Sequence, residues 1–290
     1  MQQSHFCFLL CESTMVRVKI LIIQHKMIGD VIASTVICEC LKKQYKNSEI
    51  HFLANSGTMA VLENNPHIDH AIEYKSVYSE SLKSFYGFIK TIQIQNYDVV
   101  IDAYCKVLSS IISWRSKAPI RVSFQKWYSQ YVYTRTVKRR KISETIASTA
   151  IENRLLLVNE PSKVNSMIFM PRIYLTDSEK IGGKNILKKH GLFGKRLIMF
   201  SILGSSESKS YPVEYLTKVI SYIASNSNTH FLLNYMPNQI DYVKDIFNIL
   251  PSSIKHRVHF EPYGKGLRQF LALLYWCDAL IGNEVTFPPA

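Results

Sequence analysis

The sequence predicts an α/β protein with two doubly wound domains built on mainly parallel sheets. Short apolar runs such as VRVKILII at residues 16–23 are typical of strands that are buried on both faces. Segments with helical length and spacing separate these runs, so strand and helix alternate along the chain. The length of 290 residues accommodates two domains of ordinary size.

The first series of elements gives an N-terminal Rossmann-like domain over residues 15–160. The strand at residues 16–23 is followed by a turn and by a helix over residues 30–45 with apolar residues at helical spacing. Further strands are expected at 50–54, 71–74 and 97–102, and further helices near 58–63 and over 80–95. Because Met15 directly precedes the first strand, we expect residues 1–14 to be an extension outside the fold.

A second series follows the connection at residues 161–171, which begins and ends with proline and is the expected linker. Its strands are expected at 196–201, 230–234, 258–260 and 279–281, and its helices at 177–190, 213–225, 239–250 and 267–277. The C-terminal domain therefore covers residues 172–290. It ends on a strand with no helix to cover it, so we expect this second domain to be incomplete and the chain truncated.

The charge composition favours anionic partners. The 35 Lys and Arg residues outnumber the 22 Asp and Glu residues, which gives a net charge of +13. Phosphate, nucleic acid and anionic lipid all suit such a chain. Residues 106–141 contain ten of the cations and no Asp or Glu, together with Trp114, Trp127 and several tyrosines. This segment interrupts the alternation and predicts a partly ordered, anion-facing surface, with a solvated loop as the alternative.

The cysteines and apolar windows exclude several protein classes. Six cysteines lack the density and paired spacing of a disulfide framework, which favours a reducing compartment. Cys38 and Cys40 point to different faces of the expected helix, so a shared metal is not expected. No window approaches the ~20 apolar residues of a membrane span, and residues 1–14 lack the charged start of a signal peptide.

The turn after the first strand carries the first candidate site, since open α/β sheets bind ligands at the carboxyl ends of strands. In HKMIGD, Gly29 allows a tight turn and Asp30 stands at the start of a helix. A simpler alternative is that Asp30 only caps this helix. His25 lies where it would touch an acceptor or phosphate, although an incidental role is the simpler alternative.

The second candidate site is the loop SILGSSESKSYP at residues 201–212. Small residues let backbone amides approach an anion, the following helix N-terminus carries partial positive charge, and Lys209 completes a diphosphate site. Pro212 stands near the first helical position. The spacing differs from a Walker A loop, and an ordinary serine-rich loop is the alternative.

Four segments together resemble glycosyltransferase family 9, the heptosyltransferases that use ADP-heptose to build the lipopolysaccharide core. They are KILIIQHKMIGDVIASTVICECLKKQY, EIHFLANSGTMAVLENNPHIDHAI, SILGSSESKSYPVEYLTKVI and LRQFLALLYWCDALIGNE. The resemblance covers most of residues 16–284 and implies a GT-B architecture of two Rossmann-like domains. It further implies inverting transfer of a heptose or related sugar from a nucleotide sugar to lipopolysaccharide core or a similar surface glycan.

The same resemblance implies roles for individual residues. Asp30 matches the catalytic aspartate of the family, a general base, and Lys209 matches the lysine that contacts the donor diphosphate, with Ser205 and Ser206 in the adjoining loop. The other candidate donor-binding residues are Gln239 and Glu284, and the candidate acceptor-binding residues are Gly29, His25, Arg121 and Lys126. We expect no metal and no other cofactor, because lysine and helix amides can stabilise the departing diphosphate and the sequence has no DxD-type motif.

The expected partners are a nucleotide sugar, lipopolysaccharide core or a related anionic glycolipid, and the membrane surface; no nucleic acid is expected. Basic residues near anionic lipid favour peripheral attachment at the cytoplasmic face of the inner membrane. Where the family has a Gly-rich turn after IGNE, this chain has VTFPPA, so weakened donor binding or an inactive product is one expectation. A basic nucleic-acid-binding protein that stacks bases on Trp127, or a non-catalytic glycan-binding protein, is the alternative function.

Overall fold

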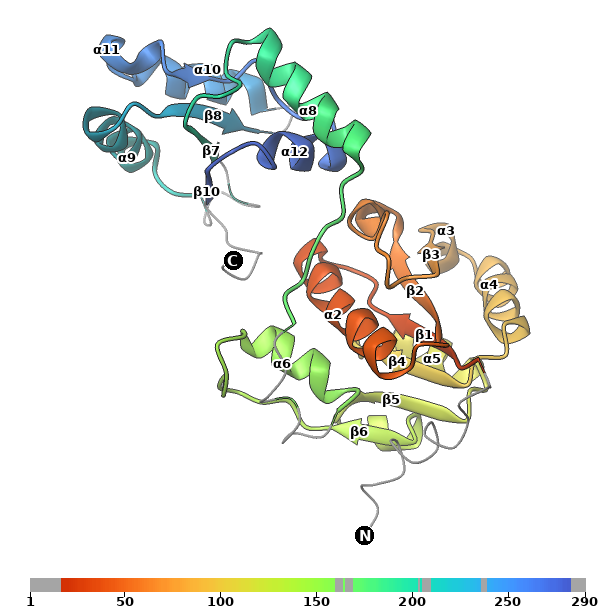
Figure 1. Ribbon diagram of the computed structural model, residues 1–290. Coiled ribbons are helices and arrows are strands. Elements are labelled where there is room, and N and C mark those ends of the chain that lie inside the picture. The colour runs from red at the N-terminus through yellow and green to blue at the C-terminus, as the bar shows by residue number, and fades with distance from the viewer. Residues whose placement is uncertain are drawn as a thin grey trace. The chain divides into compact units, whose positions relative to one another are not determined.

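The computed structural model describes residues 17–159, 164, 169–202, 204, 210–235 and 239–282 (Figure 1). The chain divides into two compact units, Met1–Tyr174 and Leu175–Ala290. Each unit contains a parallel sheet with helices packed against it, which confirms the predicted doubly wound α/β fold. The expected extension at residues 1–14 lies outside the described residues.

The first unit is built on a six-stranded sheet in the order β3-β2-β1-β4-β5-β6, in which every neighbouring pair is parallel. Its strands are β1 Lys19–Ile23, β2 Glu49–Asn55, β3 His70–Tyr74, β4 Val99–Asp102, β5 Ile120–Phe124 and β6 Arg135–Val137. Strand β1 lies inside the sheet, between β2 and β4. The run Ile20–Ile23 is therefore fully buried, as expected for a strand with helices on both faces.

The helices of this unit are α2 Ile28–Gln44, α3 Val77–Glu80, α4 Leu82–Ile94, α5 Val107–Arg115 and α6 Thr149–Leu156, with 3₁₀ turns η1 Ser56–Val61 and η2 Ser129–Tyr131. The predicted single helix over 80–95 is wrong in one respect, because Ser81 separates two helices, α3 and α4. That residue has extended backbone, and its Oγ accepts a hydrogen bond from the Ser84 amide at 3.3 Å to begin α4. The helix predicted near 58–63 is the 3₁₀ turn η1, which begins earlier.

The basic segment at residues 106–141 does not interrupt the fold, so this prediction is wrong. It forms α5, β5, η2 and β6 and so supplies two strands of the sheet. Several of its cations have partners inside the unit. Arg139 lies over the Phe124 ring at 3.9 Å, Arg115 stacks on Trp114 at 5.1 Å, and Arg140 pairs with Glu152 at 3.1 Å. The charge run is therefore partly a packing feature, because Arg and Lys stems cover apolar surface.

The second unit is built on a four-stranded parallel sheet in the order β10-β7-β8-β9. Its strands are β7 Leu197–Ser201, β8 His230–Asn234, β9 Val258–His259 and β10 Ala279–Gly282. Its helices are α8 Asp177–Lys189, α9 Val213–Asn226, α10 Ile240–Ile249, α11 Ser252–Lys255 and α12 Leu267–Leu274. These agree with the predicted elements, except that α12 ends at Leu274 and α11 was not predicted.

Two features anchor α8 in this unit. A capping box joins Thr176 and Glu179 at its start, with Glu179 Oε2 accepting from the Thr176 amide at 2.8 Å. The same carboxylate accepts two hydrogen bonds from Arg268 of α12, at 2.7 and 2.5 Å, so both helices are held together.

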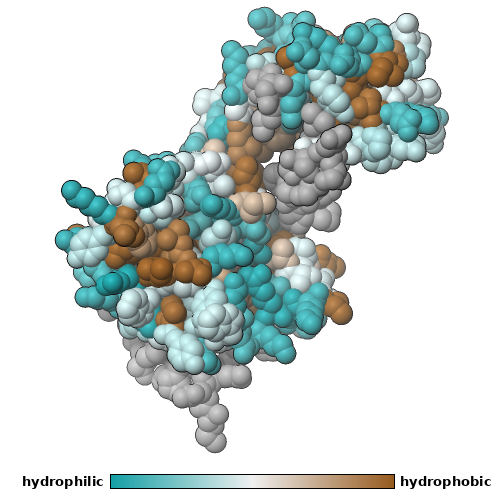
Figure 2. All heavy atoms as spheres, turned by 180° about the vertical axis from the view of Figure 1, so that it is seen from behind, coloured by the Kyte–Doolittle hydropathy of each residue, from teal (hydrophilic) through white to brown (hydrophobic). Residues whose placement is uncertain are grey.

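The surface of the first unit is partly apolar. Figure 2 shows hydrophobic side chains gathered over the region where Figure 1 places α3, α4 and α5. Leu82, Ile94 and Val107 are 88%, 74% and 69% exposed in these elements. Among the described residues, no helix combines the length and apolar character required to span a bilayer.

Candidate active site

The turn between β1 and α2 brings Asp30 to the carboxyl edge of the first sheet. Helix α2 begins at Ile28, so Gly29 and Asp30 lie within its first turn rather than in the preceding loop. The left-handed backbone conformation falls on Met27, with φ 69°, and not on Gly29. The prediction that Gly29 makes the tight turn is therefore wrong. A non-glycine residue in this conformation costs about 1 kcal/mol, and such strain is common at functional sites.

Asp30 does not serve as a helix cap, because its carboxylate is bound elsewhere. Its Oδ1 accepts a hydrogen bond from Arg154 Nη2 at 2.6 Å, and this is its one side-chain partner among the described residues. The Asp30 side chain is 48% exposed, whereas that of Arg154 is 10% exposed. One carboxylate oxygen is thus fixed by a buried cation, while about half of the side chain remains exposed.

Arg154 is held in place from two helices. It belongs to α6, which packs against α2. Its Nε donates to Ser34 Oγ at 3.1 Å and its Nη1 to the Ala150 carbonyl at 2.9 Å, while Ser34 Oγ donates to the Asp30 carbonyl at 2.7 Å. Burial lowers the pKa of Arg154, and the adjacent Asp30 carboxylate opposes that shift. The guanidinium therefore has a partner on each of its three nitrogens, as a buried cation requires.

His25 is buried beneath the same edge and is neutral at pH 7. Its ring stacks on Tyr74 at 4.7 Å between centroids and lies 5.4 Å from Tyr104. Burial and the charge of Lys26 lower the pKa of His25 to about 4. Because it is only 1% exposed, His25 lies in the interior beneath this edge and not on the surface.

Three buried polar atoms at this edge have no hydrogen-bond partner among the described residues. They are His25 Nε2, Gln24 Oε1 and Asn55 Oδ1. All three belong to the ends of β1 and β2, which are joined here by the hydrogen bond from the Asn55 amide to the His25 carbonyl at 2.9 Å. Buried polar atoms without a partner are uncommon in folded proteins and mark places where water or a polar ligand binds.

Lys126 reaches the same edge of the sheet, but Arg121 does not. Lys126 follows β5, and its Nζ donates to the Cys105 carbonyl in the loop after β4, where Tyr128 OH donates to the same oxygen at 3.3 Å. Arg121 is the second residue of β5, and its guanidinium donates to the Ala118 carbonyl at 2.6 Å and to the Val132 carbonyl at 2.9 Å. These contacts bind Arg121 to the opposite end of its strand, away from Asp30.

The second unit places its three predicted loops along one edge. Ser201, Asn234 and Gly282 end β7, β8 and β10 and are neighbours in register, so the following loops begin side by side. Gln239 precedes α10 as its N-cap, and Pro212 takes the same position before α9, one residue earlier than predicted. The Gly204 amide donates to Ser210 Oγ at 3.0 Å within the loop after β7. Ser205, Ser206, Lys209 and Glu284 lie outside the described residues.

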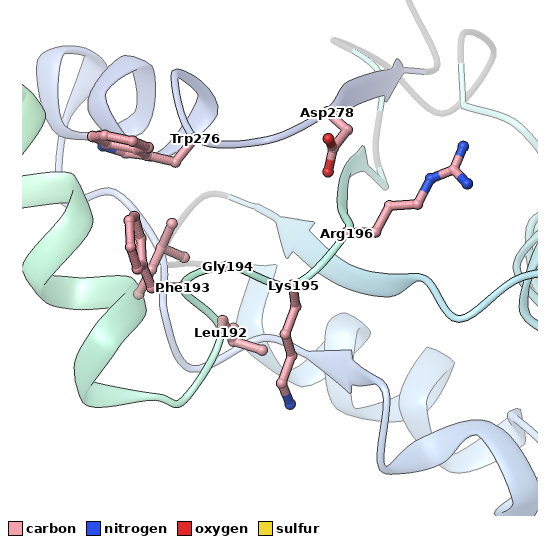
Figure 3. A pocket seen from close by; sticks show the side chains of 8 residues that line it. Leu192, Phe193, Gly194, Lys195, Arg196, Trp276 and Asp278 are labelled. Atoms are coloured by element: carbon pink, nitrogen blue, oxygen red, sulfur yellow. The ribbon is translucent and has the colours of Figure 1, made fainter.

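A cavity of about 460 Å³ lies at the other edge of this second sheet (Figure 3). Its wall contains Phe193 and Trp276, whose rings meet edge to face at 5.3 Å, and Lys195, Arg196 and Asp278 near the start of β7. Asp278 Oδ2 accepts from the Leu197 amide at 2.7 Å, which fixes it to the amino end of β7. The cavity is therefore separate from the loops after β7, β8 and β10.

Sequence reasoning did not identify Arg154, Ser34, Gln24 or Asn55 at the first edge. Arg154 lies 124 residues from Asp30 in the sequence, and no motif marks it. The polar residues that end β1 and β2, directly after apolar strands, are a usable signal, because such residues lie at the carboxyl edge of a parallel sheet.

The family model and the curated relatives point to one family. The sequence model of glycosyltransferase family 9 (heptosyltransferase) matches residues 85–284. A lipopolysaccharide heptosyltransferase 1 from Campylobacter coli is 25% identical over 204 residues, which cover 67% of this chain and 57% of that protein. The chain thus spans little more than half the length of this curated relative.

Solved structures share the fold. A glycosyltransferase family 9 protein from Veillonella parvula superposes with a TM-score of 0.75 at 21% identity, over 91% of this chain and 74% of that one. The Escherichia coli ADP-heptose lps heptosyltransferase II gives a TM-score of 0.73 at 14% identity, over 91% of this chain and 78% of that one. Both are GT-B proteins, so the predicted GT-B architecture is confirmed.

Proposed function

Because the chain belongs to glycosyltransferase family 9, we propose that it transfers a sugar from a nucleotide sugar to an acceptor hydroxyl, with Asp30 as the general base. The observation that carries this proposal is the state of the Asp30 carboxylate. It lies at the carboxyl edge of β1, half-exposed, with Oδ1 bound to Arg154 and Oδ2 available to a ligand.

In the proposed reaction, the acceptor oxygen attacks the anomeric carbon while its proton passes to Asp30 Oδ2. The bond from the anomeric carbon to the diphosphate breaks, and the nucleoside diphosphate departs with the electron pair. Attack from the face opposite the leaving group inverts the anomeric configuration. A base positioned in this way contributes about 10²- to 10⁴-fold to the rate.

The hydrogen bond from Arg154 supports this role by fixing the orientation of the carboxylate. A charge-assisted bond to one oxygen leaves the second oxygen in a defined direction, so less conformational freedom is lost in the transition state. The unpartnered polar atoms of Gln24, His25 and Asn55 lie at the same edge and suit an acceptor sugar, which presents many hydroxyl groups. Lys126 adds a cation near this edge, which suits an anionic acceptor.

The donor is proposed to bind at the loops after β7, β8 and β10 of the second unit. Lys209, Ser205 and Ser206 would contact the diphosphate, with Gln239 and Glu284 as further donor contacts. Backbone amides at the start of α9 and the Lys209 ammonium would stabilise the charge that develops on the leaving group, and this chemistry requires no metal ion.

The proposed substrates are those named for two relatives. The Campylobacter coli protein is named a lipopolysaccharide heptosyltransferase, and the Escherichia coli structure is an ADP-heptose enzyme. We therefore take ADP-heptose as the donor and lipopolysaccharide core as the acceptor. Such an acceptor lies at a membrane, and the exposed Leu82, Ile94 and Val107 provide an apolar surface that suits peripheral attachment at the cytoplasmic face of the inner membrane.

Product analysis tests the proposal. Purified chain is incubated with ADP-heptose and a panel of truncated core acceptors, and the products are identified by mass spectrometry and by NMR of the anomeric proton. The expected result is one added heptose with inverted configuration at the anomeric carbon. Retention of configuration would contradict the proposed mechanism, and turnover with no acceptor preference would contradict the proposed lipopolysaccharide acceptor.

A further inference from the structure

Three side chains with metal-binding groups meet at the amino edge of the first sheet. Glu49 and His51 lie two residues apart on β2 and so point to one face, and His70 begins the neighbouring strand β3 directly opposite His51 in register. Their ligand atoms all lie within 4.8 Å of one another. The edge is the opposite one from Asp30, because β1 starts at Lys19 beside Glu49 and ends at Ile23 before the turn to α2.

The individual distances are close to those of a metal site. His51 Nε2 lies 2.8 Å from Glu49 Oε1, and His70 Nε2 lies 3.8 Å from the same oxygen. The two imidazole rings are 4.7 Å apart and nearly perpendicular, at 74°. Ligands around a tetrahedral zinc ion at its usual bond lengths are separated by about 3.3 Å. Small side-chain rotations therefore bring all three ligand atoms onto one ion.

We propose that Glu49, His51 and His70 form a binding site for a divalent transition-metal ion such as Zn²⁺. Two imidazoles and one carboxylate form a donor set that suits such ions better than it suits calcium or magnesium. His51 is buried, whereas the His70 side chain is 63% exposed, so an ion can enter from solvent and keep a water molecule as its fourth ligand.

A second partner orients His51 for this role. Tyr97 OH lies 2.7 Å from His51 Nδ1 and is itself buried. With an ion on Nε2, Nδ1 carries the proton and donates it to the tyrosine oxygen, which is the usual support of a metal-bound histidine.

Two cations share the carboxylate, but they leave the oxygen that faces the histidines accessible. Arg17 Nε contacts Glu49 Oε2 at 3.2 Å, so it holds the far oxygen and orients the group. Lys19 Nζ is 3.7 Å from Oε1 and donates a shorter bond, 2.7 Å, to Gln95 Oε1. When a metal ion occupies Glu49 Oε1, the Lys19 ammonium therefore keeps its hydrogen bond to the uncharged Gln95 side chain.

The consequence for the fold is a link between an edge strand and its neighbour. Strand β3 is the outermost strand of the sheet, and His70 is its first residue. An ion bound to β2 and β3 together would stabilise the folded chain, because the unfolded chain offers no preformed site. The site is independent of the proposed sugar transfer.

The test is direct binding of Zn²⁺ to the full chain after chelator treatment, measured by competition with a chromophoric chelator. We expect one ion per chain at this site and a rise in the melting temperature with added Zn²⁺. His70→Ala, an exposed position that should fold normally, is expected to weaken binding at least tenfold and to abolish the thermal shift. His67→Ala, in the same unit and outside the cluster, is the matched control and should leave both unchanged.

A second measurement separates this site from other histidines. Substitution of Co²⁺ should give the visible absorption bands of a tetrahedral ion in the unmodified chain and lose them in His70→Ala. Absence of Zn²⁺ binding in the unmodified chain would overturn the proposal. Equal binding by His70→Ala would also overturn it, and loss on substitution of His259, which lies 3.0 Å from His230 in the second unit, would assign the ion there instead.

Discussion

Arg154 Nη2 donates a 2.6 Å hydrogen bond to Asp30 Oδ1 across 124 residues of sequence, and this pair defines the candidate active site. The cation is buried and the carboxylate is half-exposed, so the fold holds the arginine while the aspartate is accessible from solvent. The arrangement is that of a positioning residue behind a catalytic one: Arg154 touches no substrate in the proposed reaction and acts through the orientation of Asp30.

Replacement of Arg154 should lower turnover without a comparable change in donor binding. In Arg154→Met the charge-assisted hydrogen bond is lost, so we expect kcat to fall by about 10- to 100-fold. Arg154→Lys keeps the charge but not the planar group, so we expect it to recover part of that loss. Steady-state kinetics on soluble acceptor fragments would separate kcat from the KM for the nucleotide sugar.

Arg115→Met is a suitable control, because Arg115 is an exposed residue of α5 that stacks on Trp114. It should leave kcat unchanged. An Arg154→Met protein with full turnover, or one in which only the donor KM rises, would remove Arg154 from the positioning of Asp30.

Glu152 should make the first unit more stable at neutral than at acid pH. This buried carboxylate accepts hydrogen bonds from Ser143 Oγ at 2.7 Å, from Thr145 Oγ1 at 2.7 Å and from Arg140 Nη1 at 3.1 Å. Burial alone would raise the pKa of Glu152, but these bonds outweigh it and hold the pKa at about 2, below its ordinary value of 4.5. The carboxylate therefore contributes stability above about pH 5 that is lost as the pH falls toward 2.

Glu152→Gln should reduce the free energy of unfolding at pH 7 by about 2 kcal/mol. The difference from the unmodified chain should narrow as the pH falls from 5 toward 3, as measured by urea unfolding followed by circular dichroism. Glu144→Gln alters a half-exposed partner of Arg140, with 52% of its side chain exposed, and should change stability far less. A constant difference across this pH range would show that the charge of Glu152 does not stabilise the fold.

Lys209→Ala should weaken the binding of the nucleotide sugar and slow transfer. Loss of one ammonium from a diphosphate site typically costs 1.5–3 kcal/mol, so we expect about a 10- to 100-fold increase in the dissociation constant for ADP. Isothermal titration with ADP would measure it, and Lys218→Ala, on α9 and stacked on Tyr215 at 5.2 Å, is the control. Unchanged ADP affinity in Lys209→Ala would exclude its role at the diphosphate.

Most of the fold was predictable because the buried parallel strands are strong local signals. The runs at β1, β7 and β8 are almost purely apolar, and each was placed within a few residues of its observed bounds. The strands of the basic segment were not predicted because they lack this signal. Strand β5 contains Arg121 and Ser123 and β6 consists of Arg135, Thr136 and Val137, so neither shows a continuous apolar run.

The candidate site was predictable only in part. Asp30 stood out because it follows a buried strand, but its partner comes from α6 and no local pattern connects the two. Gly29 was expected to allow a tight turn before the helix, but α2 begins one residue earlier, at Ile28, and the positive φ falls on Met27. His25 appeared to be a loop residue, yet packing between Tyr74 and Tyr104 buries it.

In the proposed reaction Asp30 accepts the proton of the acceptor hydroxyl, and Asp30→Asn probes this step because the amide preserves the size of the side chain and removes its basicity. The measurement is the transfer rate from ADP-heptose together with the dissociation constant for ADP, with Asp177→Asn, whose side chain is 90% exposed, as control. We predict a fall in kcat of about 10²- to 10⁴-fold with ADP affinity unchanged within twofold. Transfer by Asp30→Asn at the rate of the unmodified chain would exclude Asp30 as the general base.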